Sequence, residues 1–240
     1  MVLKTEITPL VVALILVISA CQNSPVHAPV SIIGEKNKYH IVRSGDTLYS
    51  IAWRYGKDYK SLARANKIAP PYTIFLDQKI VMGDQGATGK AAAREKKARK
   101  PVKVKPKTKQ TSRTIASNAT VTWRWPMKGA ILKKFDGKIN KGIDIAGNSG
   151  TRVNAAADGV VVYAGGNLRG YGKLVIVKHN DQFLSAYGNN RKISVSEGEE
   201  VKAGQMLAEA GTSASNVEML HFEIRRDGKP KDPIGYLPRN

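Results

Sequence analysis

The sequence predicts two small domains, a β-α-α-β module followed by a mainly antiparallel β domain, joined by a disordered basic linker. Three observations predict this organisation. Residues 38–82 start and finish with β-branched runs and carry a helical apolar spacing between them, whereas residues 119–240 hold short β-rich runs between glycine turns. Residues 83–118 hold eleven Lys and Arg against two acidic residues, with no aromatic residue. Such a segment cannot bury enough apolar surface to offset its ordering entropy.

Residues 1–20 are typical of a secretory signal peptide, because Lys4 precedes an apolar run at 10–20 that is shorter than the roughly 20 residues of a membrane-spanning helix. The run ends in Val17-Ile18-Ser19-Ala20-Cys21, which resembles a bacterial lipobox. This resemblance implies that Cys21 is lipidated and becomes the first residue of the mature chain. Cys21 is the only cysteine, so no disulfide framework explains it. An ordinary signal peptide with an incidental cysteine is the alternative.

Residues 21–37, broken by Pro25 and Pro29, are then a lipidated tether. In lipoproteins of this kind, a residue other than aspartate after the cysteine implies sorting to the outer membrane, and Gln22 stands there. We therefore expect the chain on the periplasmic face of that membrane. The net charge of +20 indicates an anionic partner such as nucleic acid, lipid head groups or wall polymers. Secretion argues against nucleic acid and leaves the chain facing the cell wall.

The first domain is predicted from its apolar spacing. Residues 39–43 alternate as in a strand, and Asp46 or Thr47 can cap the helix that follows. That helix carries its apolar residues at i, i+3, i+4 and i+7, namely Leu48, Ile51, Ala52 and Tyr55. Gly56 ends it, a second short helix contains Leu62 and Ala65, and residues 79–82 form a returning strand.

This order, with Gly45-Asp46-Thr47-Leu48 followed by Ile51-Ala52, closely resembles the LysM module. The resemblance implies binding of N-acetylglucosamine-containing peptidoglycan glycan in a shallow groove between the first strand–helix turn and the second helix–strand loop. The implied glycan-binding residues are Gly45, Asp46, Thr47, Leu48, Asn66, Lys67 and Ile68. Leu48 is equally explained as a core residue, in which case binding depends mainly on the loop backbone. A departure is Leu76-Asp77, where a Pro-Gly pair is usual.

In the second domain, short apolar runs at regular spacing predict an antiparallel β-sandwich or half-barrel. The expected strands are 158–165, 173–179, 183–187, 200–205 and 220–225. Four motifs together resemble the lysostaphin/LytM-type zinc endopeptidase domain: Gly142-Ile143-Asp144-Ile145, Gly159-x-Val161-x-Tyr163-Ala164-Gly165, Gly170-Tyr171-Gly172 and Leu220-His221-Phe222-Glu223.

That family uses three zinc ligands and two further histidines. The resemblance places the ligands at Asn140, Asp144 and His221, and the other two histidines at Asn189 and Met219, so three of five positions are substituted. A catalytic zinc needs about three protein ligands and an open water position. Proton transfer needs a titratable group, which asparagine and methionine lack. We therefore expect no catalysis and no cofactor, with an Asp144–His221 hydrogen bond inside a vacated groove.

A degenerate LytM-type domain joined to a LysM module on a lipoprotein resembles the murein hydrolase activators of Gram-negative bacteria. The resemblance implies activation of N-acetylmuramoyl-L-alanine amidases in cell-wall remodelling and daughter-cell separation, with the vacated groove receiving an amidase helix. The expected groove residues are Asn140, Asp144, Asn189, Met219 and His221, with Tyr171 and Tyr187 near the rim. Two alternatives stay open, a zinc-dependent peptidoglycan endopeptidase and an inert wall-binding tether.

Overall fold

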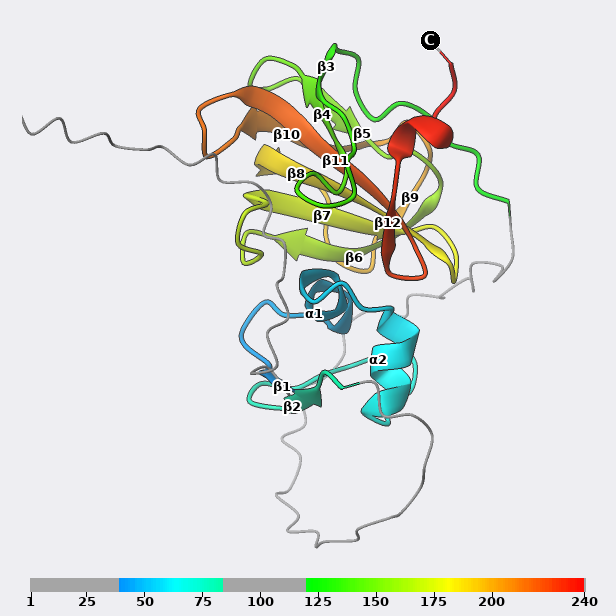
Figure 1. Cartoon of the computed structure of the whole chain (residues 1–240). Coiled ribbons are helices and arrows are strands. Elements are labelled where there is room, and N and C mark those ends of the chain that lie inside the picture. Colours follow the sequence, from blue (N-terminus) through cyan, green and yellow to red (C-terminus); the bar gives the residue numbers. More distant parts are fainter. Residues whose placement is uncertain (1–38, 84–119, 240) are drawn as a thin grey trace, which may run out of the picture.

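The computed structural model describes residues 39–83 and 120–239. The first domain contains, in order, β1 (Tyr39–Ile41), α1 (Leu48–Arg54), α2 (Tyr59–Ala65) and β2 (Lys79–Val81). β1 and β2 pair antiparallel, and the two helices pack together on one side of them (Figure 1). The predicted β-α-α-β fold is therefore confirmed, with strands shorter than the sequence pattern predicted. The signal peptide, the tether, Cys21 and most of the basic linker lie outside the described residues.

The start of α1 is fixed by a capping box. The Thr47 side chain accepts a hydrogen bond from the Ser50 amide, and the Ser50 side chain accepts one from the Thr47 amide. These two bonds satisfy amides that would otherwise have no partner within the helix. Of the two predicted caps, Thr47 is therefore the one used. Asp46 instead accepts hydrogen bonds from the Arg43 amide, at 2.9 Å, and from the His40 ring, at 2.8 Å.

The second domain is built almost entirely from antiparallel strands, as predicted. Its central sheet runs in the order β3-β4-β11-β10-β8-β7-β6-β9, with β8 also pairing directly with β11. The strands are β3 (Ile131–Lys133), β4 (Ile143–Ala146), β5 (Arg152–Asn154), β6 (Gly159–Gly165), β7 (Lys173–Lys178), β8 (Phe183–Ile193), β9 (Glu200–Val201), β10 (Met206–Thr212), β11 (Glu218–Arg226) and β12 (Lys229–Lys231). A single 3-10 turn, Pro233–Gly235, follows. No helix among the described residues is long and apolar enough to cross a membrane.

The side chains of strand β11 alternate between the two faces of this sheet, because successive side chains of a strand point to opposite sides. Leu220, Phe222 and Ile224 are fully buried in the core of the second domain. The alternate positions, His221, Glu223 and Arg225, therefore lie on the other face, which we call the polar face. Arg225 is paired across the strands with Leu184 of β8, and Glu223 with Ala186.

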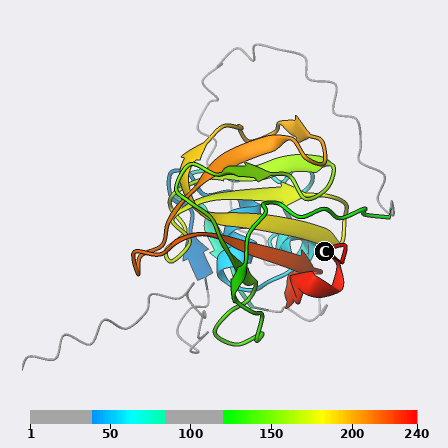
Figure 2. The same ribbon diagram turned by 90° about the horizontal axis from the view of Figure 1, so that it is seen from above.

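The first domain packs against this polar face. Leu48, Ile51 and Trp53 of α1 form one apolar cluster with second-domain residues that include Tyr163, Leu174, Ile176, Leu184 and Ala186. α1 lies directly against the sheet at β6 in Figure 1, and the view from above in Figure 2 shows the first domain beneath the strands. The described parts of the two domains thus form one packed unit.

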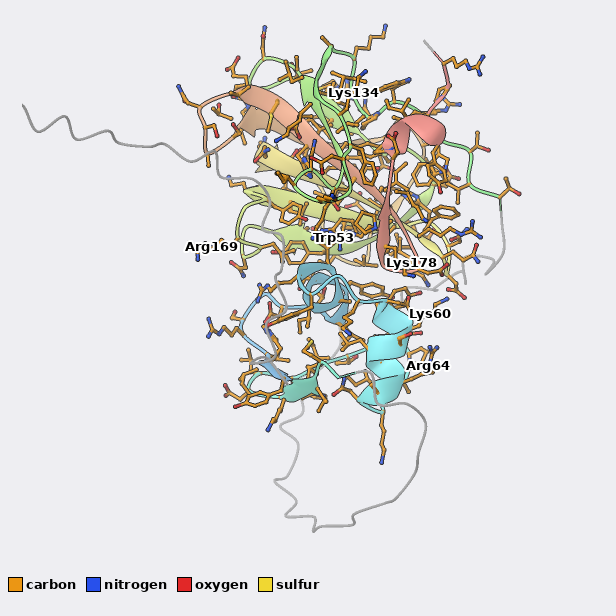
Figure 3. The ribbon with its side chains drawn as sticks, viewed as in Figure 1. Trp53, Lys60, Arg64, Lys134, Arg169 and Lys178 are labelled. Atoms are coloured by element: carbon orange, nitrogen blue, oxygen red, sulfur yellow. The ribbon has the colours of Figure 1, made fainter. Side chains whose placement is uncertain are left out.

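The centre of the interface is Arg225, which is only 1% exposed. Its guanidinium lies 3.6 Å from the Trp53 ring centroid, and its Nη1 donates to the Trp53 carbonyl at 2.8 Å. Its Nε donates to Glu223 Oε2 at 2.9 Å. Figure 3 shows Trp53 at the junction between α1 and the sheet. A buried arginine is tolerated because its charge and its donors all have partners.

We predict that Arg225→Ala lowers the free energy of unfolding by about 3 kcal/mol, because it leaves Glu223 buried without its guanidinium and removes the contact with Trp53. The matched control is the neighbouring Arg226→Ala, whose side chain is 48% exposed. This change should alter stability by less than about 0.5 kcal/mol. Urea unfolding followed by tryptophan fluorescence measures both. Equal stabilities of the two variants would contradict this role for Arg225.

Candidate functional site

The candidate site is a row of ionisable side chains on the polar face, which we call the polar row: Asp144, His221, Glu223 and Arg225. Strand pairing creates it, since Asp144 of β4 lies directly opposite His221 of β11. Strand alternation then carries Glu223 and Arg225 onto the same face. All four residues are buried. The row runs from the family's zinc position to the interface with the first domain.

Each member of the polar row is bonded to the next. His221 Nδ1 hydrogen-bonds to Asp144 Oδ1 at 2.6 Å, which confirms the predicted pair. His221 Nε2 lies 3.2 Å from Glu223 Oε1, and the same oxygen accepts the Tyr171 hydroxyl at 2.7 Å. Arg225 continues the row from Glu223 to Trp53. Both ring nitrogens of His221 are thus occupied by carboxylates.

The carboxylates control the charge of His221. Burial alone would lower the pKa of His221, but hydrogen bonds and charge from Asp144 and Glu223 raise it to about 9. Burial likewise opposes ionisation of Glu223, yet Arg225 and His221 hold its pKa at about 2. The raised pKa of His221 and the lowered pKa of Glu223 favour an imidazolium–carboxylate pair beside the Arg225 guanidinium.

Asn140 precedes β4 and is 5% exposed. Its amide nitrogen donates to the Lys134 carbonyl at 3.1 Å, and its backbone amide donates to the Asp136 side chain. These bonds stabilise the loop before β4. The described residues contain no group of three or more His, Cys, Asp or Glu positioned to hold a metal ion. The residues at the family's zinc position do not fit a catalytic zinc, since Asn140 offers a neutral amide oxygen where the resemblance places a histidine ligand, and only Asp144 and His221 keep the ligand chemistry.

Of the other expected groove residues, Tyr171, Met219 and Asn189 lie near the polar row, whereas Tyr187 lies in the core. Tyr171 contacts the polar row, with its ring 5.8 Å from that of His221, and Met219 is half-buried two residues before His221 on β11. Asn189 has a φ of 59° and donates its amide to the Tyr171 carbonyl at 2.7 Å. Tyr187 does not lie near the rim. It is fully buried among the core residues of the opposite face, where its hydroxyl accepts the Ala156 amide.

Glu223 and Arg225 were missed by the sequence reasoning, although a signal for them exists. His221, Glu223 and Arg225 alternate within an otherwise apolar strand. Charged residues at i, i+2 and i+4 of a buried strand must lie on one face and find partners there. His179, in contrast, is structural. Its ring bonds to the Asp158 carbonyl and to Ser185, and burial lowers its pKa to about 4.

Most side chains of the expected glycan-binding residues in the first domain pack or hydrogen-bond within the protein. Leu48 is 1% exposed and belongs to the core. Asn66 exchanges hydrogen bonds with the backbone of Val81 in both directions, and the Asp46 carboxylate is bonded to His40. The Thr47 hydroxyl donates to the Val162 carbonyl of the second domain at 3.2 Å. Gly45, Lys67 and Ile68 complete the set, and Gly45 and Lys67 are exposed.

Comparisons with known proteins agree with this architecture. The LysM domain model matches residues 40–83, and the model of Peptidase family M23 matches residues 138–233. The chain is 47% identical to the "Lipoprotein NlpD/LppB homolog" of Pseudomonas aeruginosa over 83% of this chain and 77% of the relative. It is 36% identical to the "Murein hydrolase activator NlpD" of Escherichia coli over 83% of this chain and 68% of the relative.

A third relative, the "Outer membrane antigenic lipoprotein B" of Haemophilus influenzae, is 36% identical over 91% of this chain and 68% of the relative. The relatives thus share most of their length with this chain, across both domains. The chain belongs to the NlpD/LppB family of lipoproteins, in which a LysM domain is joined to a domain of peptidase family M23.

Proposed function

We propose that this chain is a non-catalytic lipoprotein that binds peptidoglycan through its LysM domain and activates N-acetylmuramoyl-L-alanine amidases. The observation that carries the proposal is the polar row, in which the carboxylates of Asp144 and Glu223 bond both ring nitrogens of His221 at the position where relatives of the peptidase family would hold zinc. The domain keeps the fold of a peptidase but lacks the donors that the hydrolysis requires.

A zinc endopeptidase is the weaker alternative. Only Asp144 and His221 keep the family's ligand chemistry, and the pKa of His221 is raised by its two carboxylate partners. Asn189 and Met219 supply no proton donor or acceptor that titrates near neutral pH. The polar row therefore supports a role in binding and not in bond cleavage.

Activation of another hydrolase is supported by the Escherichia coli relative, which is named a murein hydrolase activator. In this chain the surface beside the polar row offers Met219 as an adaptable apolar contact. Asn140, Asp144, Asn189 and His221 form the proposed floor, and Tyr171 lies beneath them against Glu223. We propose a groove at this place, which would suit an amphipathic helix of the amidase.

Attachment to the outer membrane is part of the same proposal. Cys21 would carry the lipid, and two or more acyl chains anchor a protein far more stably than one. The names of the relatives support this placement, since they are called lipoproteins and one is called an outer membrane antigen. The LysM domain, facing the periplasm, would then bind the glycan strands of the wall.

We predict that Met219→Asp reduces stimulation of a purified amidase at least fivefold in a dye-release assay, because it places a charge in the apolar contact with the amidase helix. The matched control is Ile234→Asp, which changes an exposed apolar residue of the 3-10 turn. It should stimulate normally. If Met219→Asp stimulates normally while neutralising Lys96 to Lys107 abolishes stimulation, then the basic linker and not the groove recruits the amidase.

We also predict that the purified protein holds far less than one zinc ion per chain. Asn140→His should raise its zinc affinity by completing the ligand set, without restoring hydrolysis. Asn148→His, an exposed change on the following turn, is the control and should leave zinc affinity unchanged. Metal analysis and a zymogram measure these outcomes. Stoichiometric zinc with EDTA-sensitive hydrolysis by the unmodified protein would establish the endopeptidase instead.

A further inference from the structure

A cavity of about 550 Å³, open on one side, lies between the two domains beside the first strand–helix turn of the LysM domain. The LysM domain contributes the start of α1 at residues 46–49 and the loop at residues 71–74. The second domain contributes residues 160–162 of β6 and the turn around Glu197, Gly198 and Glu200. The expected residues Asn66, Lys67 and Ile68 are not among its lining residues. One wall of the cavity is thus formed by the LysM domain and the other by the peptidase-like domain.

Interdomain hydrogen bonds fix this arrangement. The Thr47 hydroxyl, on the LysM wall, donates a hydrogen bond to the Val162 carbonyl on the opposite wall. The Asn167 side chain donates to the Ser44 carbonyl at 3.1 Å, and Arg54 donates to the Asn167 carbonyl at 3.2 Å. A side chain at Gly45 would displace the Asn167 amide from its bond to the Ser44 carbonyl, and the positive φ of 78° also favours glycine at this position. The cavity is thus a defined space with two fixed walls.

The chemistry of the walls indicates the class of ligand. Tyr49 and Tyr72 lie in a T-shaped arrangement with centroids 6.0 Å apart, and Leu48, Ile74 and Val160 add aliphatic surface. Glu197 and Glu200 supply hydrogen-bond acceptors, Thr73 supplies a hydroxyl, and no lysine or arginine lines the cavity. An anionic ligand would be repelled there. A neutral sugar with hydroxyl and amide donors and an N-acetyl methyl group fits, because pockets for small molecules combine apolar walls with a few polar groups.

We propose that this cavity is a two-domain binding site for N-acetylhexosamine units of the glycan strand, with β6 and the turn around Gly198 forming its second wall. The proposal rests on the proposed peptidoglycan binding and extends it, since the peptidase-like domain becomes part of the sugar site. A sugar held between both walls binds only the docked arrangement and therefore stabilises it.

The test uses the full mature chain titrated with the hexamer of N-acetylglucosamine by calorimetry. Val160→Trp fills the cavity from the second domain and should weaken binding at least tenfold. Val217→Trp makes the same change at an exposed position of the same domain, outside the cavity, and should alter affinity less than twofold. If Val160→Trp fails to fold, as judged by circular dichroism, Glu200→Ala replaces it, with Glu218→Ala as its control. Glu200→Ala should weaken binding at least threefold.

Unchanged affinity of the folded cavity variant, with normal binding by the unmodified chain, would overturn the two-domain site and leave peptidoglycan binding by the LysM domain intact. Failure of the unmodified chain to bind the hexamer would overturn both. Preferential binding of a free stem peptide that the same variants weaken would overturn the assignment of the ligand as a sugar. The amidase assay is unaffected by any of these results and tests activation separately.

Discussion

The buried guanidinium of Arg225 is the constraint on which the arrangement of this molecule depends. A charge at 1% exposure is tolerated only with complete pairing, and its partners come from two domains. Glu223 supplies the carboxylate from the same strand, while Trp53 supplies a ring face and a carbonyl from α1 of the LysM domain. Docking of the first domain therefore satisfies a charge that the second domain could not bury alone.

The same pairing extends to the residues that resemble the zinc position of peptidase family M23. Glu223 shares its two oxygens between Arg225 on one side and His221 and Tyr171 on the other. His221 is in turn bonded to Asp144. The polar row thus connects the peptidase-like site to the LysM domain through direct bonds, without a metal ligand set. The two domains share one face of one sheet, so the proposed wall-binding and amidase-binding sites would lie on adjacent surfaces of a single unit.

Much of the fold could be predicted from the sequence, because the apolar spacing of α1 and the β-branched runs of β6 and β7 are strong local signals. β10 was not predicted, since Met206–Thr212 contains alanine and glycine in place of good strand formers. The Asp144–His221 pair followed from the family motif. Glu223 and Arg225 were missed because their partner Trp53 lies 172 residues from Arg225 in the sequence. Tyr187 was misplaced because Asn189 has a positive φ of 59°, which interrupts the alternation that would otherwise put these two side chains on one face of the strand.

The central claim is that the LysM and peptidase-like domains form one docked unit through Arg225. The most direct measurement is the distance distribution between spin labels on Lys67 and Lys229, two exposed positions in different domains, in a chain whose single cysteine is replaced. We expect one narrow distribution of label distances in the protein with Arg225 intact and a broader distribution after Arg225→Ala. A broad distribution that Arg225→Ala leaves unchanged would contradict this claim, because the domains would then move independently.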